Sequence, residues 1–323
     1  MTSDGEFVWR PIEPADAGNW SALLIAIQAA DHGWDFFSEQ DLLEMFGDPD
    51  RDFPRGSMGV FTGGAMVGYG MLGCREAADP VHEMRYSGGV HPACRQRGLG
   101  GQLLSWAETA AVPLHRERYP DRPLSLSGSC LSHNAAAAAL YAARGYHPVR
   151  WFHAMVRDLT TALPEVPAPP GVQITPFTPE QSETARLIRN EAFTDHRGST
   201  EISAEGWAHF RAASAFRPAF SFLAYASDEP AGFVISHEYD VYAEATGIQD
   251  LFIAILGTRR AARKRGIGSA LLVRALTEAR TAGFTSASLT VDADSPTGAV
   301  GLYERTGFTV DHTSVTQSKP LLP

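Results

Sequence analysis

The sequence predicts an α/β protein built from two copies of one domain, each a mixed sheet with helices on both faces. A run of basic residues, paired glycines and an apolar helix start occupies 95–104 and recurs at 263–272, an offset of 263 − 95 = 168 residues. A β-like run and a short Ala-rich helix ending in Leu-Tyr follow each copy. A chain of 323 residues, 44% of them hydrophobic, can bury a core in each of two domains.

Hydrophobic spacing and turn residues place the elements of the first half in the order β-α-α-β-β-β-α-β-α-β. Apolar residues at helical spacing mark the first helix, and Ser38 begins the second. Gly63-Gly64 forms the turn of a hairpin. The expected elements are strand 7–12, helices 15–30 and 38–46, strands 57–62, 66–73 and 84–90, helix 101–114, strand 123–129, the Ala-rich helix from 134, and strand 146–159.

The second half repeats this order after a proline-rich joint. Four prolines lie between 160 and 171, which predicts a semi-rigid linker over 161–171 between domains at 1–160 and 172–323. The expected elements are strand 172–177, helices 179–193 and 203–216, strands 221–226 and 232–238 around the turn at 228–230, strand 251–257, helix 269–282, strand 286–291, the second Ala-rich helix and strand 308–315.

Composition excludes several classes of protein. The net charge of −10 argues against broad nucleic-acid binding, which needs a basic surface. Cys74, Cys94 and Cys130 lack metal-ligand spacing, so we expect reduced structural thiols and no metal. The first residues lack a signal-peptide pattern and no apolar run approaches about 18 residues, so we expect a cytoplasmic protein with no membrane contact.

The glycine motif predicts an anion site. Glycines at the start of a helix let the backbone approach a ligand closely, and the first turn offers unpaired N–H groups with partial positive charge. Neighbouring arginines favour a phosphate or pyrophosphate. Neither copy matches Gly-x-x-x-x-Gly-Lys-Ser/Thr or completes Gly-x-Gly-x-x-Gly. The candidate residues are Arg95, Gln96, Arg97, Gly98, Leu99, Gly100 and Gly101, and Arg263, Lys264, Arg265, Gly266, Ile267, Gly268 and Ser269.

Together with the later motifs, this pattern resembles the acyl-CoA-binding motifs of the GNAT (N-acetyltransferase) superfamily. The later motifs read Asn134…Leu140-Tyr141…Gly145-Tyr146 and Leu302-Tyr303…Gly307-Phe308. The resemblance covers both halves and implies tandem domains with mostly antiparallel sheets. It also implies acetyl-CoA as co-substrate, with its pyrophosphate on the glycine loops and charge-assisted bonds from Arg95, Arg97, Arg263 and Arg265.

The resemblance implies direct attack of an amine on the thioester of acetyl-CoA. Tyr141 and Tyr303 match the position of a tyrosine that protonates the leaving CoA sulfur, and a phenol with a pKa near 10 suits that role. An aromatic residue on an Ala-rich helix is also typical of a core position, and both interpretations stand. Asn134 matches an asparagine that lies beside CoA in the family.

The general base departs from the family pattern. The position of a glutamate in several relatives falls on Met84 and Phe252, neither of which can take a proton. Asp250 lies two residues before Phe252 and would share its strand face, so it is our candidate base. Other candidates are a water chain and the nearby acidic residues Glu238, Asp240 and Glu244.

The sequence therefore predicts an acetyl-CoA-dependent N-acetyltransferase acting on a small-molecule amine. Asp250 and the acidic segment 238–244 favour chemistry in the C-terminal half, as in a known two-domain GNAT architecture, although Asn134 and Tyr141 give the N-terminal half the more regular motif. The alternative is a non-catalytic, regulatory GNAT-fold protein that binds acyl-CoA. The missing strand carboxylates motivate this second interpretation.

Overall fold

A computed structural model describes residues 7–48, 51–73, 80–194, 200–295 and 298–323. The chain forms two compact units. Unit 1 contains Met1–Arg150 together with Ser314–Pro323, and unit 2 contains Trp151–Thr313. Each unit has a mixed sheet flanked by helices, which confirms the predicted fold class.

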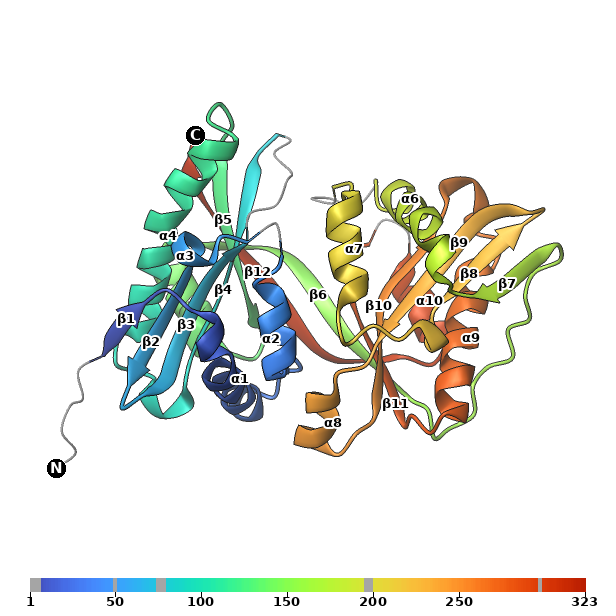
Figure 1. The fold of residues 1–323 in the computed structure, drawn as a ribbon, viewed down its shortest axis with the longest axis horizontal. Helices are drawn as coiled ribbons and strands as arrows, with labels where there is room; N and C mark the ends of the chain where they lie inside the picture. The colour runs from blue at the N-terminus through green and yellow to red at the C-terminus, as the bar shows by residue number, and fades with distance from the viewer. Residues whose placement is uncertain (1–6, 49–50, 74–79, 195–199, 296–297) are drawn as a thin grey trace. The chain divides into compact units, whose positions relative to one another are not determined.

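The sheet of unit 1 has the strand order β1-β2-β3-β4-β5-β12, in which only β4 and β5 are parallel. Helix α4 packs on one face, and α1 and α2 pack on the other (Figure 1). The elements are β1 (Val8–Arg10), α1 (Ala17–Asp31), α2 (Glu39–Met45), α3 (Phe53–Gly56), β2 (Ser57–Thr62), β3 (Ala65–Gly73), β4 (His82–Val90), α4 (Leu99–Arg118), β5 (Leu124–Leu131) and α5 (Ala135–Ala143).

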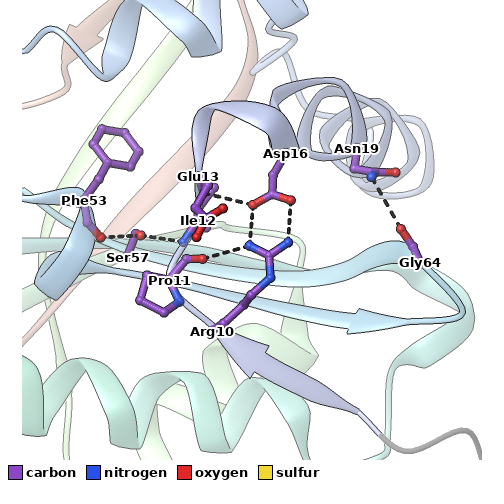
Figure 2. Close-up of polar contacts among 9 residues, drawn as sticks. All are labelled: Arg10, Pro11, Ile12, Glu13, Asp16, Asn19, Phe53, Ser57 and Gly64. Carbon is purple, nitrogen blue, oxygen red and sulfur yellow. Dashed lines mark hydrogen bonds and ion pairs between the residues drawn. The ribbon is translucent and has the colours of Figure 1, made fainter.

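A polar network fixes the start of unit 1 and the entry to α1 (Figure 2). The guanidinium of Arg10 donates to both carboxylate oxygens of Asp16 at 2.6 and 2.7 Å. The hydroxyl of Ser57 donates to the carbonyl of Phe53 at 2.6 Å and accepts from the N–H of Ile12 at 2.9 Å. These bonds hold α1 on the β1–β2 edge, and the far end of α1 carries Asp31, which contacts the first glycine loop.

The sheet of unit 2 has the order β6-β11-β10-β9-β8-β7, in which only β10 and β11 are parallel. Helix α9 packs on one face, and α6 and α7 pack on the other (Figure 1). The elements are β6 (His147–Asp158), β7 (Val172–Pro176), α6 (Ser182–Ala192), α7 (Ala204–Ala212), β8 (Phe222–Ala226), β9 (Glu229–His237), α8 (Asp240–Thr246), β10 (Asp250–Thr258), α9 (Ile267–Thr281), β11 (Ser286–Asp292), α10 (Ala299–Arg305) and β12 (Thr309–Leu322).

Each sheet is completed by a strand from the other sequence repeat. β6 follows the first Ala-rich helix, yet its residues 152–158 pair with β11 of the second repeat. β12 follows the second Ala-rich helix, yet its residues 314–322 pair with β5 of the first. Lys319 of β12 also donates to Glu108 of α4 at 2.9 Å. The compact units therefore exchange a strand, and their limits follow the packing of the chain rather than the sequence repeat. The domain limits predicted from the proline-rich joint, 1–160 and 172–323, remain a proposal about where the two sequence repeats meet.

The structure corrects three local expectations. The turn before β9 is Ser227-Asp228, both with positive φ (51° and 64°), so Glu229 and Pro230 belong to the strand rather than to the turn. A register shift near Pro230 accommodates its missing N–H. The acidic segment after β9 contains α8, and β12 extends to Leu322 rather than ending at 315.

Candidate functional site

Both glycine loops have the same backbone conformation. Gly98 and Gly266 have φ of 80° and 82° and immediately precede α4 and α9. Gln96 and Lys264, two residues earlier, have φ of 62° and 60°. A residue with a Cβ would be strained in place of either glycine. The glycines carry no side chain that could cap the first N–H groups of the helix. These groups are therefore of the kind that can bind an anion, and the binding of a ligand there stays a prediction.

The second glycine of each loop joins the two motifs of the repeat. A Cβ placed on Gly100 would lie 3.2 Å from a methyl carbon of Leu140, and one on Gly268 would lie 3.2 Å from a methyl carbon of Leu302. These leucines precede Tyr141 and Tyr303 in the sequence. The glycine therefore allows the Ala-rich helix to approach the start of α4 or α9, a packing role that the sequence prediction did not include.

The first arginine of each loop holds the loop in place. Arg95 makes a two-pronged ion pair with Asp31 of α1 at 2.7 and 2.8 Å and donates to the carbonyl of Val90 at 3.2 Å. Arg263 donates to the carbonyl of Ala192, at the end of α6, at 2.8 Å. Because these guanidinium groups are engaged within the protein, we assign Arg95 and Arg263 a positioning role.

The other cationic side chains of the loops are more exposed than Arg95 and Arg263, and they can reach a bound anion more easily. Lys264 and Arg265 are exposed in unit 2. Arg97 is exposed in unit 1, with its guanidinium 4.6 Å from the centre of the Phe7 ring. Of the remaining loop positions, Leu99 and Ile267 are buried in the core, Gly101 and Ser269 are half-buried, and Gln96 is exposed.

The two candidate tyrosines are buried in corresponding places. Tyr141 of α5 is 6% exposed and Tyr303 of α10 is 8% exposed, and both belong to hydrophobic clusters. Burial raises the pKa of Tyr303 to about 12 and raises the pKa of Tyr141 well above its usual value. Both phenols therefore keep their proton at neutral pH, which is the state that a general acid needs.

The two units differ in how early the central parallel strands separate. β4 pairs with β5 from His82 to Tyr86, whereas β10 pairs with β11 only from Asp250 to Phe252. In unit 2 the β9–β10 register also shifts by one residue between Ile253 and Ile255, a β-bulge at Ala254. A bulge bends its strand. The pairing of β3 with β4 in unit 1 runs from Gly68–Val90 to Gly73–Arg85 without a shift.

In unit 1, tyrosine side chains fill the region where β4 and β5 stop pairing. The hydroxyl of Tyr86 lies against the backbone of Gly88, where a Cβ would be only 2.0 Å away, and the hydroxyl of Tyr141 lies 2.2 Å from the Cβ position of Gly128. Tyr86 and Gly128 form the final pair of the β4–β5 ladder. Buried phenols therefore occupy this end of the ladder in unit 1.

Asp250 lies at the start of β10 as a half-buried carboxylate. The hydroxyl of Ser288 on β11 donates to it. Burial raises the pKa of Asp250, and hydrogen bonds from Ser288 and Ser286 oppose that shift. Leu251 and Ile253 pack toward α9, so Asp250 and Phe252 lie on the opposite face of the sheet. A carboxylate with a raised pKa beside the separating strands has the chemistry of a general base.

The other acidic candidates are engaged or exposed. Glu238 accepts from Arg217 at 2.7 Å and from Gln249 at 3.3 Å. Asp240 lies 3.5 Å from the same arginine, and Glu244 is exposed on α8. Asn134 caps α5, with its side-chain oxygen accepting from the N–H of Ala137 at 3.0 Å. The predicted contact of Asn134 with CoA stays a prediction beside this capping role.

Sequence reasoning missed the aromatic and imidazole groups around this end of β10. The Tyr239 ring lies 6.1 Å from that of Phe252. Burial raises the pKa of Tyr242 on α8, and the negative charge of Asp250 adds to this shift. His237 ends β9 directly across from Phe252. The only sequence signal for His237 is its position at the end of an apolar strand. The sequence does not indicate which neighbouring strand it lies against.

Within the part of the chain that the structure describes, no group of three or more His, Cys, Asp or Glu side chains could hold a metal ion. In the same ranges no helix is long and apolar enough to cross a membrane. Cys94 and Cys130 are free thiols, and Cys74 lies outside the described residues.

Comparison with known proteins defines the class to which this fold and these loops belong. Residues 184–308 match the acetyltransferase (GNAT) family, and residues 56–148 match an acetyltransferase (GNAT) domain. The chain belongs to the GNAT acetyltransferase family, with two GNAT domains, and is an N-acetyltransferase.

Particular relatives narrow this class. The chain is 32% identical to a mycothiol acetyltransferase from Streptomyces avermitilis, covering 98% of each chain. It is 32% identical to one from Thermobispora bispora, covering 77% of this chain and 79% of that protein. A solved GCN5-related N-acetyltransferase from Sphaerobacter thermophilus superposes with a TM-score of 0.78 at 26% identity, covering 98% of this chain and 96% of that one. A tandem GNAT protein from the clavulanic acid biosynthesis pathway shares the fold, with a TM-score of 0.74 at 20% identity and coverage of 98% and 99%.

Proposed function

We propose that unit 2 transfers the acetyl group of acetyl-CoA to the amine of a small-molecule acceptor. The observation that carries this assignment is the early separation of β10 from β11 after Phe252, together with the bulge at Ala254. Parted strands leave backbone N–H and C=O groups that no neighbouring strand uses, and a bent strand re-aims them. Such groups can form hydrogen bonds with the amides of an extended ligand. They can also orient the thioester carbonyl of acetyl-CoA between the two strands.

The residues of unit 2 then take complementary roles. N–H groups at the start of α9, with Lys264 and Arg265, bind the pyrophosphate of the co-substrate. The carboxylate of Asp250 takes a proton from the amine as nitrogen attacks the thioester carbon. The buried hydroxyl of Tyr303 gives its proton to the departing sulfur, and because burial raises its pKa to about 12 it is protonated before each turnover.

The acceptor that the relatives suggest is related to mycothiol. Two relatives at 32% identity are named mycothiol acetyltransferase. Acetylation that yields mycothiol would act on its unacetylated precursor, an amine that also carries a thiol. We therefore propose this precursor as the first acceptor to test.

Titration calorimetry of acetyl-CoA into the whole chain, followed by turnover with that precursor, tests the function. Product is best detected by mass, since a thiol reagent would also react with the acceptor. Acetylated product that disappears in a Gly266→Val variant and persists in Gly98→Val supports chemistry in unit 2. The reverse pattern would assign the chemistry to unit 1.

For unit 1 we propose a non-catalytic acyl-CoA-binding or structural role. Two observations favour this second candidate: the β3–β4 ladder has no bulge, and the Tyr86 hydroxyl occupies the end of the β4–β5 ladder. Its glycine loop nevertheless keeps the same backbone conformation as that of unit 2. Calorimetry showing two acetyl-CoA sites per chain would support binding without turnover, and one site would favour a structural role.

A further inference from the structure

His237 carries a buried polar atom that the protein does not satisfy. Its side chain is 4% exposed, at the end of β9. Its Nδ1 atom lies 3.4 Å from the hydroxyl of Tyr239, while Nε2 is buried and has no hydrogen-bond partner among the residues that the structure describes. Buried side-chain nitrogens are nearly always hydrogen-bonded, so this atom is one at which a ligand could supply the missing partner.

The register of the sheet places this atom beside the proposed reaction site. His237 lies directly across from Phe252 on β10, and Phe252 lies across from Ser288 on β11. Residues paired in this way project to the same face, with strands about 4.8 Å apart. Ser288 and Phe252 are also the final pair before β10 and β11 separate. Asp250 shares this face two residues earlier on β10, so His237 and Asp250 both neighbour Phe252, His237 across the ladder and Asp250 along the strand.

The surroundings keep His237 neutral and largely enclosed by rings. Phe210 and Phe216 lie 5.0 and 6.3 Å from the imidazole, and Tyr239 lies 6.0 Å away, between ring centres. Burial, together with the positive charge of Arg217, lowers the pKa of His237 to about 4. At neutral pH the ring is therefore uncharged. When Nδ1–H donates to the Tyr239 hydroxyl, Nε2 presents a lone pair and acts only as an acceptor.

We propose that Nε2 of His237 accepts a hydrogen bond from the acceptor amine and holds it beside the opening between β10 and β11. An amine has more than one N–H, so one bonds His237 while Asp250 removes the proton of another. The N–C bond forms and the C–S bond breaks, the proton from nitrogen ends on the Asp250 carboxylate, and sulfur takes the proton of Tyr303. This inference rests on the proposed function of unit 2.

Two substitutions test it in the whole chain. His237→Phe removes Nε2 but keeps a planar ring among Phe210 and Phe216, and His237→Gln restores a polar acceptor near the position of Nε2. We expect His237→Phe to lower kcat/KM for the mycothiol precursor about 10- to 100-fold, with the KM for acetyl-CoA changed less than twofold. His237→Gln should recover at least part of this loss. The melting temperature of His237→Phe should stay level or rise, since an apolar ring replaces an unpaired polar atom.

A matched control is His147→Phe, the same change at an exposed histidine, which should leave both substrates unaffected. Wild-type turnover with unchanged acceptor kinetics in His237→Phe would overturn this inference and leave the proposed function standing. Equal losses for both substrates, with no recovery in His237→Gln, would show that His237 serves only packing. Absence of acetyl transfer by the wild-type chain would overturn the proposed function, and this inference with it.

Discussion

At the scale of single residues, Tyr141 and Tyr303 allow a paired comparison inside one chain. They occupy matching positions on α5 and α10, and both are buried. If Tyr303 is the acid of the reaction, Tyr303→Phe should lower kcat by about 10²- to 10⁴-fold, because the sulfur then leaves unprotonated. Tyr141→Phe should change kcat less than threefold. Steady-state kinetics with both substrates measures the two effects, and a larger loss in Tyr141→Phe would transfer the acid role to unit 1.

A second prediction concerns the role of Asp250 and the dependence of activity on pH. Catalysis needs the ionised carboxylate, so kcat should fall as pH decreases through the raised pKa of Asp250, above the ordinary value of 3.8. Because burial raises the pKa of Tyr303 to about 12, the acid role should not limit the rate at moderately alkaline pH. Asp250→Asn should remove the acid limb together with most of the rate. A variant that keeps the wild-type pH profile would point to another base.

A separate prediction concerns the effect of the Asp250 carboxylate on the stability of the folded protein. The raised pKa of Asp250 means that the folded protein disfavours the ionised form relative to the unfolded chain. Its charge therefore costs stability above the raised pKa, and the cost vanishes below the ordinary value of 3.8. Asp250→Asn should raise the melting temperature at pH 7, with the gain shrinking as pH falls. Thermal unfolding across that range provides the measurement, and a lowered melting temperature at pH 7 would contradict it.

Sequence alone could identify residues that belong to a local pattern, and it could not assign partners distant in the chain. Gly98, Gly266 and both tyrosines stand in short motifs whose spacing is visible. The role of Arg95 depends on Asp31, which lies 64 residues away, and that distance hides an ion pair from any local pattern. His237 depends on the register of β9 against β10, which only pairing defines.

At the scale of elements, the glycine loops and their helices offer a comparison between units. Gly266→Val forces a branched residue into a left-handed conformation, which costs at least about 1 kcal/mol and distorts the first turn of α9. Gly268→Val adds a clash with Leu302, whose methyl carbon lies 3.2 Å from the Cβ position. Either change should abolish turnover, with acetyl-CoA affinity measured by calorimetry falling in parallel. Gly98→Val and Gly100→Val serve as matched controls, and loss of turnover in those variants instead would reverse the assignment.

Most elements follow from hydrophobic spacing and turn residues, whereas insertions and bulges do not. The β2–β3 hairpin and the helices after the glycine loops lie within a few residues of their predicted limits. Helix α8 was missed because its sequence, DVYAEAT, reads as an acidic connection without an extended apolar face. The bulge at Ala254 was equally hidden, since Ile253 and Ile255 continue an apolar run without interruption.

At the scale of the whole molecule, the exchange of β6 and β12 makes the two sequence repeats depend on each other. Removing Ser314–Pro323 should damage unit 1, although these residues follow the second repeat, because β5 loses one of its two neighbouring strands and Glu108 loses Lys319. Hydrogen exchange should then show weakened protection of β5 amides, while β10 and β11 amides change less. Removal of Pro323 alone, which lies outside β12, is the control. Unchanged β5 protection would contradict this view.

An experiment with fragments tests directly whether unit 1 needs the β12 segment in order to fold. Residues 1–160 alone lack the β12 segment and should fold poorly. Residues 1–150 joined by a flexible linker to 314–323 contain every strand of unit 1 and should unfold cooperatively on heating. Circular dichroism of both fragments compares them. Cooperative unfolding of the 1–160 fragment would show that the predicted sequence boundary is also a folding boundary.

The exchanged strand also has a consequence for biosynthesis. Domains generally fold as units while the ribosome extends the chain, with earlier domains first. The sheet of unit 1 cannot be completed in that order, because β12, the second of the two strands that pair with β5, is translated only after the rest of the second repeat. Until then β5 presents an unpaired edge of the kind that recruits other strands. A ribosome that stalls within the second repeat would therefore release a chain in which the first domain is incomplete as well as the second.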